Sequence, residues 1–145
     1  MSSQERATVV ALITNLLVNG YAVTRVVQLY QDGTLAGEDA LSAWARAVVW
    51  VIPAAIGLTI VLNILFNLMD KDRKHNNVVD ERDQNFQMRG IGVTLIVICL
   101  GYVVMLTGLA FGWTALVALN LLFFAFAAGD LLGNAVRLAS YRIGA

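Results

Sequence analysis

The stretch LMDKDRKHNNVVDERDQNFQMRG, Leu68–Gly90, divides this chain into two apolar halves. It holds ten of the twenty acidic and basic side chains of the sequence and its only histidine. The chain as a whole is 59% hydrophobic and 14% charged, with a mean hydropathy of +0.71. Soluble domains are nearer half apolar, and about a quarter of their residues are charged. The sequence therefore predicts an integral membrane protein with its charge gathered in one central loop.

Two apolar segments lie on each side of this loop. A transmembrane helix needs about 20 predominantly apolar residues, and four segments meet that length. The expected spans are residues 7–30, 41–69, 88–109 and 113–138, with the polar loop at 70–87. The opening MSSQERATVV lacks the basic segment of a signal peptide, so the first span is expected to remain as a helix. We expect an all-α fold, a single domain over residues 1–145 that forms a four-helix transmembrane bundle.

Lysine and arginine fall mostly on one side of the expected spans. The majority side carries Arg6, Lys71, Arg73, Lys74, Arg82, Arg89, Arg137 and Arg142. Only Arg25 and Arg46 lie towards the other side, next to the acidic connection 31–40. Because basic residues are retained on the cytoplasmic side, both termini and the central loop are expected to be cytoplasmic.

The end of the central loop, VVDERDQNFQMRG, has the features of a helix start. Asp80 or Asp83 is able to cap free amide groups there, and acidic residues suit the first turn of a helix. Arg82 and Arg89 are seven residues apart and so share one helical face. We expect the third span to begin about two turns early, in the cytoplasm. In the simpler alternative, the basic residues of the loop only set topology and contact anionic lipid.

Polar side chains recur inside the apolar spans, mostly as pairs four residues apart. Such residues are costly in a membrane and therefore informative. The set is Asn15, Asn19, Asn63, Asn67, Asn120, Asp130 and Asn134. These side chains either join helices through hydrogen bonds or line a polar cavity in which Asp130 is the one ionisable group. Asp130 also has Arg137 and Arg89 as alternative partners, which would make it structural.

Small residues indicate where helices approach closely. Ala125, Gly129 and Gly133 recur every four residues in the last span, a pattern that permits close contact between helix backbones. The sequence leaves open whether this stripe packs within one chain or across a homodimer.

Two other residues bear on the shape and placement of the second span. Pro53 has no amide hydrogen, which predicts a kink. Trp44 lies near an expected interface and is predicted to belong to an aromatic belt.

The sequence contains no recognisable catalytic pattern. His75 stands alone in the polar loop, and Cys99 lies in an apolar run where it is expected to pack as a small apolar residue. The metalloprotease, phosphate-loop and nucleophile-elbow motifs are missing from the sequence. We therefore expect no enzymatic activity, no metal and no cofactor. The zero formal net charge gives no indication of direct nucleic-acid binding.

At VVDERDQNFQMRG the chain resembles a broad set of small prokaryotic four-span membrane proteins. Their shared layout is a polar central loop that ends in an Asp-Glu-Arg signature, here Asp80, Glu81 and Arg82, directly before the third span. Members of this set often accompany a cytoplasmic DNA-binding regulator as membrane-tethered inhibitors or sensors. The resemblance implies a multi-pass protein of the prokaryotic inner (plasma) membrane with such a regulator as its partner.

These observations support a leading hypothesis and two alternatives. In the first, the chain is a membrane-anchored sensor or inhibitor that binds a cytoplasmic regulatory protein through the loop and the inner helix ends. The expected partner-binding residues are Arg73, Lys74, Asp80, Glu81, Arg82, Asp83 and Arg89. The second is a small oligomeric transporter or channel with a polar cavity around Asp130, expected as a homodimer. The third is an assembly subunit whose polar residues only pack helices.

Overall fold

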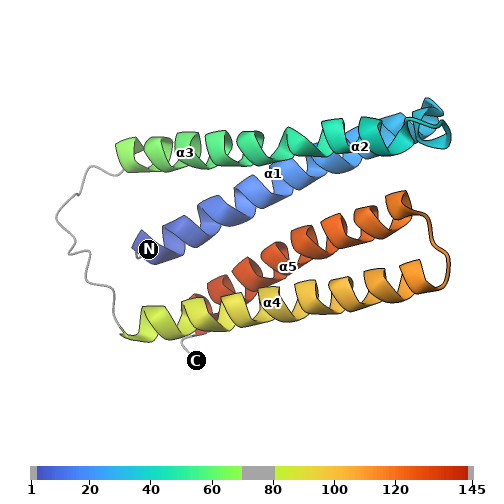
Figure 1. Ribbon diagram of the computed structural model, residues 1–145. Helices are drawn as coiled ribbons and strands as arrows, with labels where there is room; N and C mark the ends of the chain where they lie inside the picture. The colour runs from blue at the N-terminus through green and yellow to red at the C-terminus, as the bar shows by residue number, and fades with distance from the viewer. Residues whose placement is uncertain (1–2, 70–80, 144–145) are drawn as a thin grey trace.

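The computed structural model describes residues 3–69 and 81–143, which are almost wholly helical (Figure 1). The elements are α1 (Ser3–Gln31), the short 3-10 turn η1 (Thr34–Ala36), α2 (Ala40–Val49), α3 (Val51–Met69), α4 (Glu81–Ala110) and α5 (Ala115–Ile143). Four spans are long and apolar enough to cross a membrane: Glu5–Gln31, Ala40–Phe66, Glu81–Ala110 and Ala115–Ile143. The expected all-α, four-span fold is confirmed, and the chain has the architecture of a multi-pass membrane protein.

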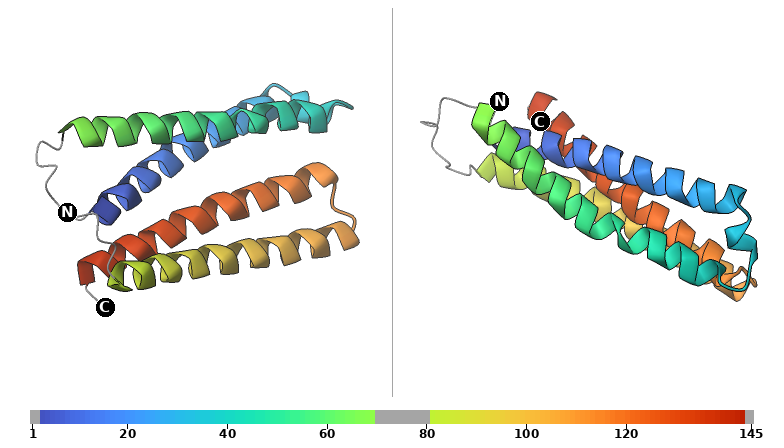
Figure 2. Two further views of the ribbon diagram at one scale, coloured as in Figure 1. Left: turned by 60° about the vertical axis from the view of Figure 1, so that its left-hand side comes forward. Right: turned by 90° about the horizontal axis from the view of Figure 1, so that it is seen from above.

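The helices follow the spatial order α3, α1, α5, α4 (Figures 1 and 2). Helix α1 packs against both α3 and α5, while α5 packs along the length of α4. Helices α3 and α4 lie at the two ends of this order and form no extended interface among the described residues. The bundle is therefore built from two hairpins, which are joined mainly by the α1–α5 contact and also by α2 against α5.

The second span is two helices with a break at Trp50. Helix α2 ends at Val49 and α3 begins at Val51, and the two follow each other in nearly one line (Figure 1). Pro53 has no N–H to donate to the carbonyl of Val49, four residues earlier, so the regular helix is interrupted at that turn. The amide of Ala54 donates to the Trp50 carbonyl at 3.2 Å and resumes the helical pattern. The expected kink is therefore replaced by a one-residue break one turn before Pro53, across which the helix keeps nearly the same direction.

The small residues of α5 pack against α4. A Cβ atom added at Gly101 of α4 would lie 2.2 Å from the Cβ of Ala125. One added at Gly133 of α5 would lie 2.6 Å from the backbone oxygen of Gly90. Both distances are far inside van der Waals contact, so larger side chains would push the helices apart. The stripe is thus used within the chain, which answers the question that the sequence left open.

A tight turn joins α4 to α5. Gly112 has a φ of +86°, in the left-handed region that glycine adopts without steric cost. The amide of Trp113 donates to the carbonyl of Gly108 at 2.9 Å, which closes the C-terminal end of α4. This short turn holds α4 and α5 antiparallel and side by side.

The polar ends of three helices gather at one end of the bundle. The start of α1, the start of α4 and the end of α5 lie together there, and the α1–α2 connection lies at the opposite end (Figure 1). Helix α4 begins at Glu81, about two turns before the expected span at residue 88, as the helix-start pattern predicted. Helix α5 continues to Ile143, past the expected limit at residue 138.

Candidate functional site

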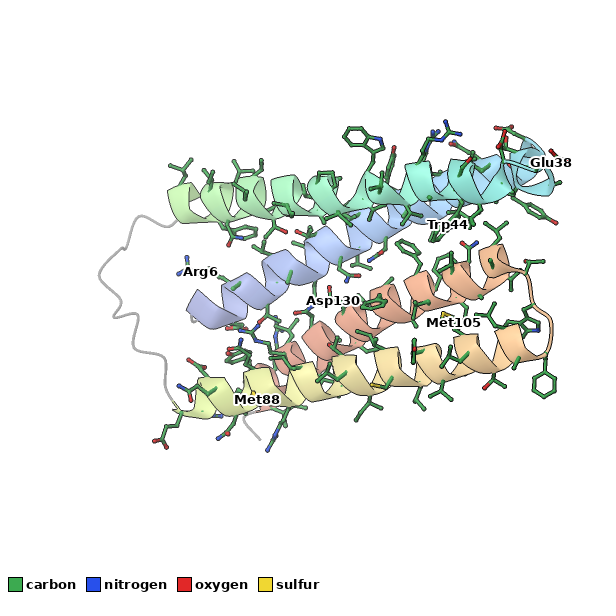
Figure 3. All side chains as sticks on the ribbon, viewed as in Figure 1. Arg6, Glu38, Trp44, Met88, Met105 and Asp130 are labelled. Carbon is green, nitrogen blue, oxygen red and sulfur yellow. The ribbon has the colours of Figure 1, made fainter. Side chains whose placement is uncertain are left out.

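Asp130 lies on α5, between that helix and α1 (Figure 3). It belongs to a chain of side-chain hydrogen bonds that joins these two helices. Asn15 donates through Nδ2 to Asp130 Oδ2 at 2.5 Å, and Asn19 donates to Asn15 Oδ1 at 2.8 Å. Asn134 donates to Asp130 Oδ1 at 3.0 Å. Two of the polar pairs noted in the sequence therefore form one network, which crosses the contact between the two hairpins.

The Asp130 carboxylate is bonded by amides and has no cationic partner in the part of the chain described. Its two oxygens accept from Asn15 and Asn134, and no described lysine or arginine forms an ion pair with it. The alternative in which Arg89 or Arg137 neutralises Asp130 is therefore not the arrangement found. The carboxylate keeps the capacity to accept further hydrogen bonds from a cation.

A cavity of about 370 Å³ lies between α1, α3 and α5 and has Asp130 in its wall. Asn15, Asn19 and Asn63 also line it, so polar side chains from three helices meet there. Asn63 donates through Nδ2 to the Thr59 carbonyl in its own helix and does not join the Asp130 network. The side chain of Asn67 lies outside the described residues.

Thr14 is a polar member of this wall that the sequence analysis did not single out. It is only 6% exposed, and its hydroxyl finds no hydrogen-bond partner among the described residues. A buried hydroxyl without a partner costs about 1–3 kcal/mol, so each such group calls for an explanation. Thr14 precedes Asn15 directly, and a search for hydroxyls beside the polar pairs would have found it.

A second cavity, of about 190 Å³, lies between α4 and α5. Asp130, Asn134 and Arg137 line it together with Gly90 and Thr94 at the close helix contact. Asp130 thus borders a cavity on each side of α5.

Asn120 lies apart from the other polar residues. Its Oδ1 accepts a hydrogen bond of 2.8 Å from the indole N–H of Trp44, and its Nδ2 donates to the Leu116 carbonyl. Ten residues separate it from Asp130, about 15 Å along the helix. The structure does not bring Asn120 to the cavity, because the two side chains occupy different levels of α5. Trp44 is 8% exposed, and its indole N–H ties α2 to α5.

An arginine–aromatic cluster lies on the early turns of α4. Phe86 is 4% exposed, with the guanidinium carbons of Arg82 and Arg89 at 5.3 and 6.0 Å from its ring centroid. Its ring meets Tyr141 of α5 edge to face, with centroids 5.2 Å apart and an interplanar angle of 83°. These are the distances of cation–π and aromatic pairs. Arg82 and Arg89 share one face, as their spacing predicted; the ring between them was missed.

The remaining expected contact residues divide into two groups. Glu81 and Asp83 lie in the first turn of α4, where acidic side chains complement the helix dipole. Arg73, Lys74 and Asp80 lie outside the described residues. At the same end, Arg142 Nε lies 4.0 Å from Glu5 Oε1 and links the end of α5 to the start of α1.

Metal ligands do not gather in residues 3–69 or 81–143: no three His, Cys, Asp or Glu side chains are placed to hold an ion. Cys99 is a free, exposed thiol on α4. The chemical capacity of the described site is therefore that of one carboxylate among amides and hydroxyls, which suits binding of a hydrogen-bond donor with positive charge.

Fold and site together define a small four-span membrane protein with a polar network at its centre and a charged cluster at one end. No family model, no curated protein and no solved structure matches the chain. The resemblance carried by Asp80, Glu81 and Arg82 therefore stays a prediction.

Proposed function

We propose that this chain is a membrane-anchored sensor or inhibitor that binds a cytoplasmic regulatory protein through its charged central loop and inner helix ends. The observation that carries the proposal is the arginine–aromatic cluster of Arg82, Phe86, Arg89 and Tyr141. The cluster holds charged turns of α4 in helical form beyond the apolar span. Binding to an ordered surface avoids part of the entropy cost of association.

The distribution of basic residues supports a cytoplasmic position for this surface. Eight of the ten lysines and arginines lie on the side of the cluster, the central loop and both termini. The opposite connection carries Asp32, Glu38 and Asp39. By the positive-inside rule, the cluster then faces the cytoplasm of a prokaryotic plasma membrane. Guanidinium groups at such a surface suit a partner that presents carboxylates or phosphates.

A sensor also needs a signal that distinguishes two states of the bundle. Helix α5 carries both Asp130, in the central network, and Tyr141, in the cluster. A ligand that alters the α1–α5 contact would therefore move an element of the partner-binding surface. This connection makes α5 the expected route from the membrane interior to the regulator.

The test is chemical cross-linking in native membranes, followed by purification in mild detergent and identification of the bound protein. We expect a cytoplasmic DNA-binding regulator to be recovered with the native chain. Recovery should be lost with the triple variant Asp80→Ala, Glu81→Ala, Arg82→Ala. It should persist in the matched control Arg25→Ala, Arg46→Ala, which changes charge at the opposite end. Equal recovery of the regulator with the triple variant and with the control would contradict the proposed binding surface.

A second candidate function is a small oligomeric transporter or channel. It is favoured by the position of Asp130, which borders one cavity on each side of α5. Four helices barely enclose a pore, so this function calls for a homodimer. Ion and solute flux into liposomes that contain the purified chain is the measurement. Flux that survives Asp130→Asn, or no flux from the native chain, would exclude this candidate.

A further inference from the structure

The cavity between α1, α3 and α5 has the carboxyl group of Asp130 in its wall, and the bonds described for that group come from α1 and α5. The Asp130 carboxylate accepts hydrogen bonds only from neutral amides within the described residues. Asp130 is an exposed residue of α5 that borders the cavity, and its carboxylate oxygens can accept stronger, charge-assisted hydrogen bonds from a cation than from neutral amides. The charge of the site therefore favours a cationic ligand.

The free hydrogen-bonding capacity around the carboxylate is mainly that of acceptors. The amide nitrogens of Asn19 and Asn63 each use one of their two N–H donors, toward Asn15 and toward the Thr59 carbonyl, while both of their carbonyl oxygens keep two lone pairs. No described residue donates to their own carbonyl oxygens, and the Thr14 hydroxyl is buried without a partner. A primary ammonium carries three N–H donors and is able to bond several of these acceptor oxygens at once. A quaternary ammonium has no N–H donor, so the site favours the primary ammonium.

Size and wall chemistry specify the rest of the ligand. A cavity of about 370 Å³ is in the range of small-molecule sites, which are about 300–1,000 Å³. Away from the polar residues, the apolar wall includes Val10, Val18, Val51, Phe123, Phe126 and Ala127. Apolar and aromatic walls around a few convergent polar groups are typical of sites for small amphipathic molecules.

We propose that this cavity binds a small amphipathic primary amine in its protonated form, with the ammonium group on Asp130 and the apolar part against Phe123 and Phe126. The site is independent of the regulator-binding surface and stands if that surface is disproved. The headgroup of an aminophospholipid carries the same ammonium chemistry. Asp130 lies seven residues, about 10 Å, deeper along α5 than Arg137. A free amine reaches that depth more easily than a headgroup held at the interface.

The first experiment uses the full chain in nanodiscs of phosphatidylcholine and phosphatidylglycerol, without amino lipid. Binding of radiolabelled 2-phenylethylamine is measured by equilibrium dialysis, and uptake by empty nanodiscs is subtracted. We expect saturable binding of the amine. Loss of the charged hydrogen bonds should make neutral 2-phenylethanol weaker by about tenfold to a hundredfold. The trimethylammonium analogue, which has no N–H donor, should also bind more weakly. Equal binding of amine and alcohol would overturn the proposal.

Matched variants locate the site. Asp130→Asn should weaken amine binding by about tenfold or more, while Asp39→Asn, in the opposite connection, leaves it unchanged. Thr14→Val should weaken binding a few-fold, and its control Thr107→Val, at the exposed outer end of α4, should not. Unchanged affinity in Asp130→Asn refutes the assignment.

Two further arms keep the result decisive. Ala127→Leu fills the cavity without changing its polar groups and should abolish saturable binding. If Asp130→Asn does not fold, Ala127→Leu and Thr14→Val test the location of the site, and unchanged amine binding in both would overturn the proposal. The lipid arm repeats the assay in nanodiscs with phosphatidylethanolamine. Amine binding that persists there supports a free amine as the occupant. Loss of amine binding, together with Asp130-dependent retention of that lipid, would overturn the proposal in favour of a headgroup site.

Discussion

Replacement of Gly133 by alanine should destabilise the contact between α4 and α5. The added Cβ would lie 2.0 Å from the Thr94 hydroxyl oxygen and 2.6 Å from the backbone oxygen of Gly90. Ordinary van der Waals contact begins at 3.4 Å, so the second distance is short by 0.8 Å. The Gly90 oxygen belongs to a helix backbone and cannot rotate away. The two helices must therefore separate locally.

The magnitude follows from three effects. Overpacking of a tight contact costs about 1–3 kcal/mol. Separation also weakens the bond from the Thr94 hydroxyl to the Gly129 carbonyl, 3.0 Å long, which contributes about 0.6 kcal/mol in a membrane bundle. Alanine regains up to about 1 kcal/mol through its higher helix propensity. The net loss for Gly133→Ala is about 1–3 kcal/mol.

Gly92→Ala is the matched control on the facing helix. A Cβ at Gly92 meets nothing within 4 Å, so only the propensity gain remains, and the variant should match or exceed the native stability. Both variants are unfolded reversibly in mixed micelles with increasing dodecyl sulfate, and helicity is followed by circular dichroism. Equal stability of Gly133→Ala and Gly92→Ala would refute the account of the α4–α5 contact.

Three other predictions use the same unfolding assay or hydrogen exchange. Trp44→Phe removes the indole donor to Asn120 but keeps an aromatic ring, and it should cost about 1 kcal/mol; no change would mean that the 2.8 Å bond contributes nothing. Phe86→Ala removes a buried ring and should cost about 3 kcal/mol. It should also raise amide exchange in the first two turns of α4, and unchanged exchange there would contradict the ordering role of the cluster. Arg142→Ala should change stability by less than about 0.5 kcal/mol, because its ion pair with Glu5 is long and the arginine is 70% exposed; a larger loss would argue against this estimate.

The sequence predicted much of the local structure. Length and apolar content were sufficient to locate the four spans, because a helix in a bilayer must satisfy its own backbone hydrogen bonds. The early start of α4 followed from acidic residues before an apolar run, and the common face of Arg82 and Arg89 followed from a spacing of seven. Each of these properties depends on residues near one another in the chain.

Contacts between helices were predicted less well. Asn120 carries the same side chain as Asn15 and lies on the same helix as Asp130, yet it pairs with Trp44 at another level of the bundle. The ring of Phe86, which brings two arginines and Tyr141 together, gave no signal of its own in the composition. Spacing assigns a residue to a face of its helix, but it does not show which helix that face will meet.

The sequence by itself thus determined the number, length and polarity of the helices, since these depend on each segment and its solvent. Only the tertiary structure decided that the small-residue stripe of α5 packs on α4 and that Asp130 of α5 meets Asn15 of α1. It also placed Thr14 in the cavity wall without a partner. These outcomes depend on the rotation of each helix about its axis and on its position beside its neighbours. Both are set by the summed packing of all the helices rather than by any one segment.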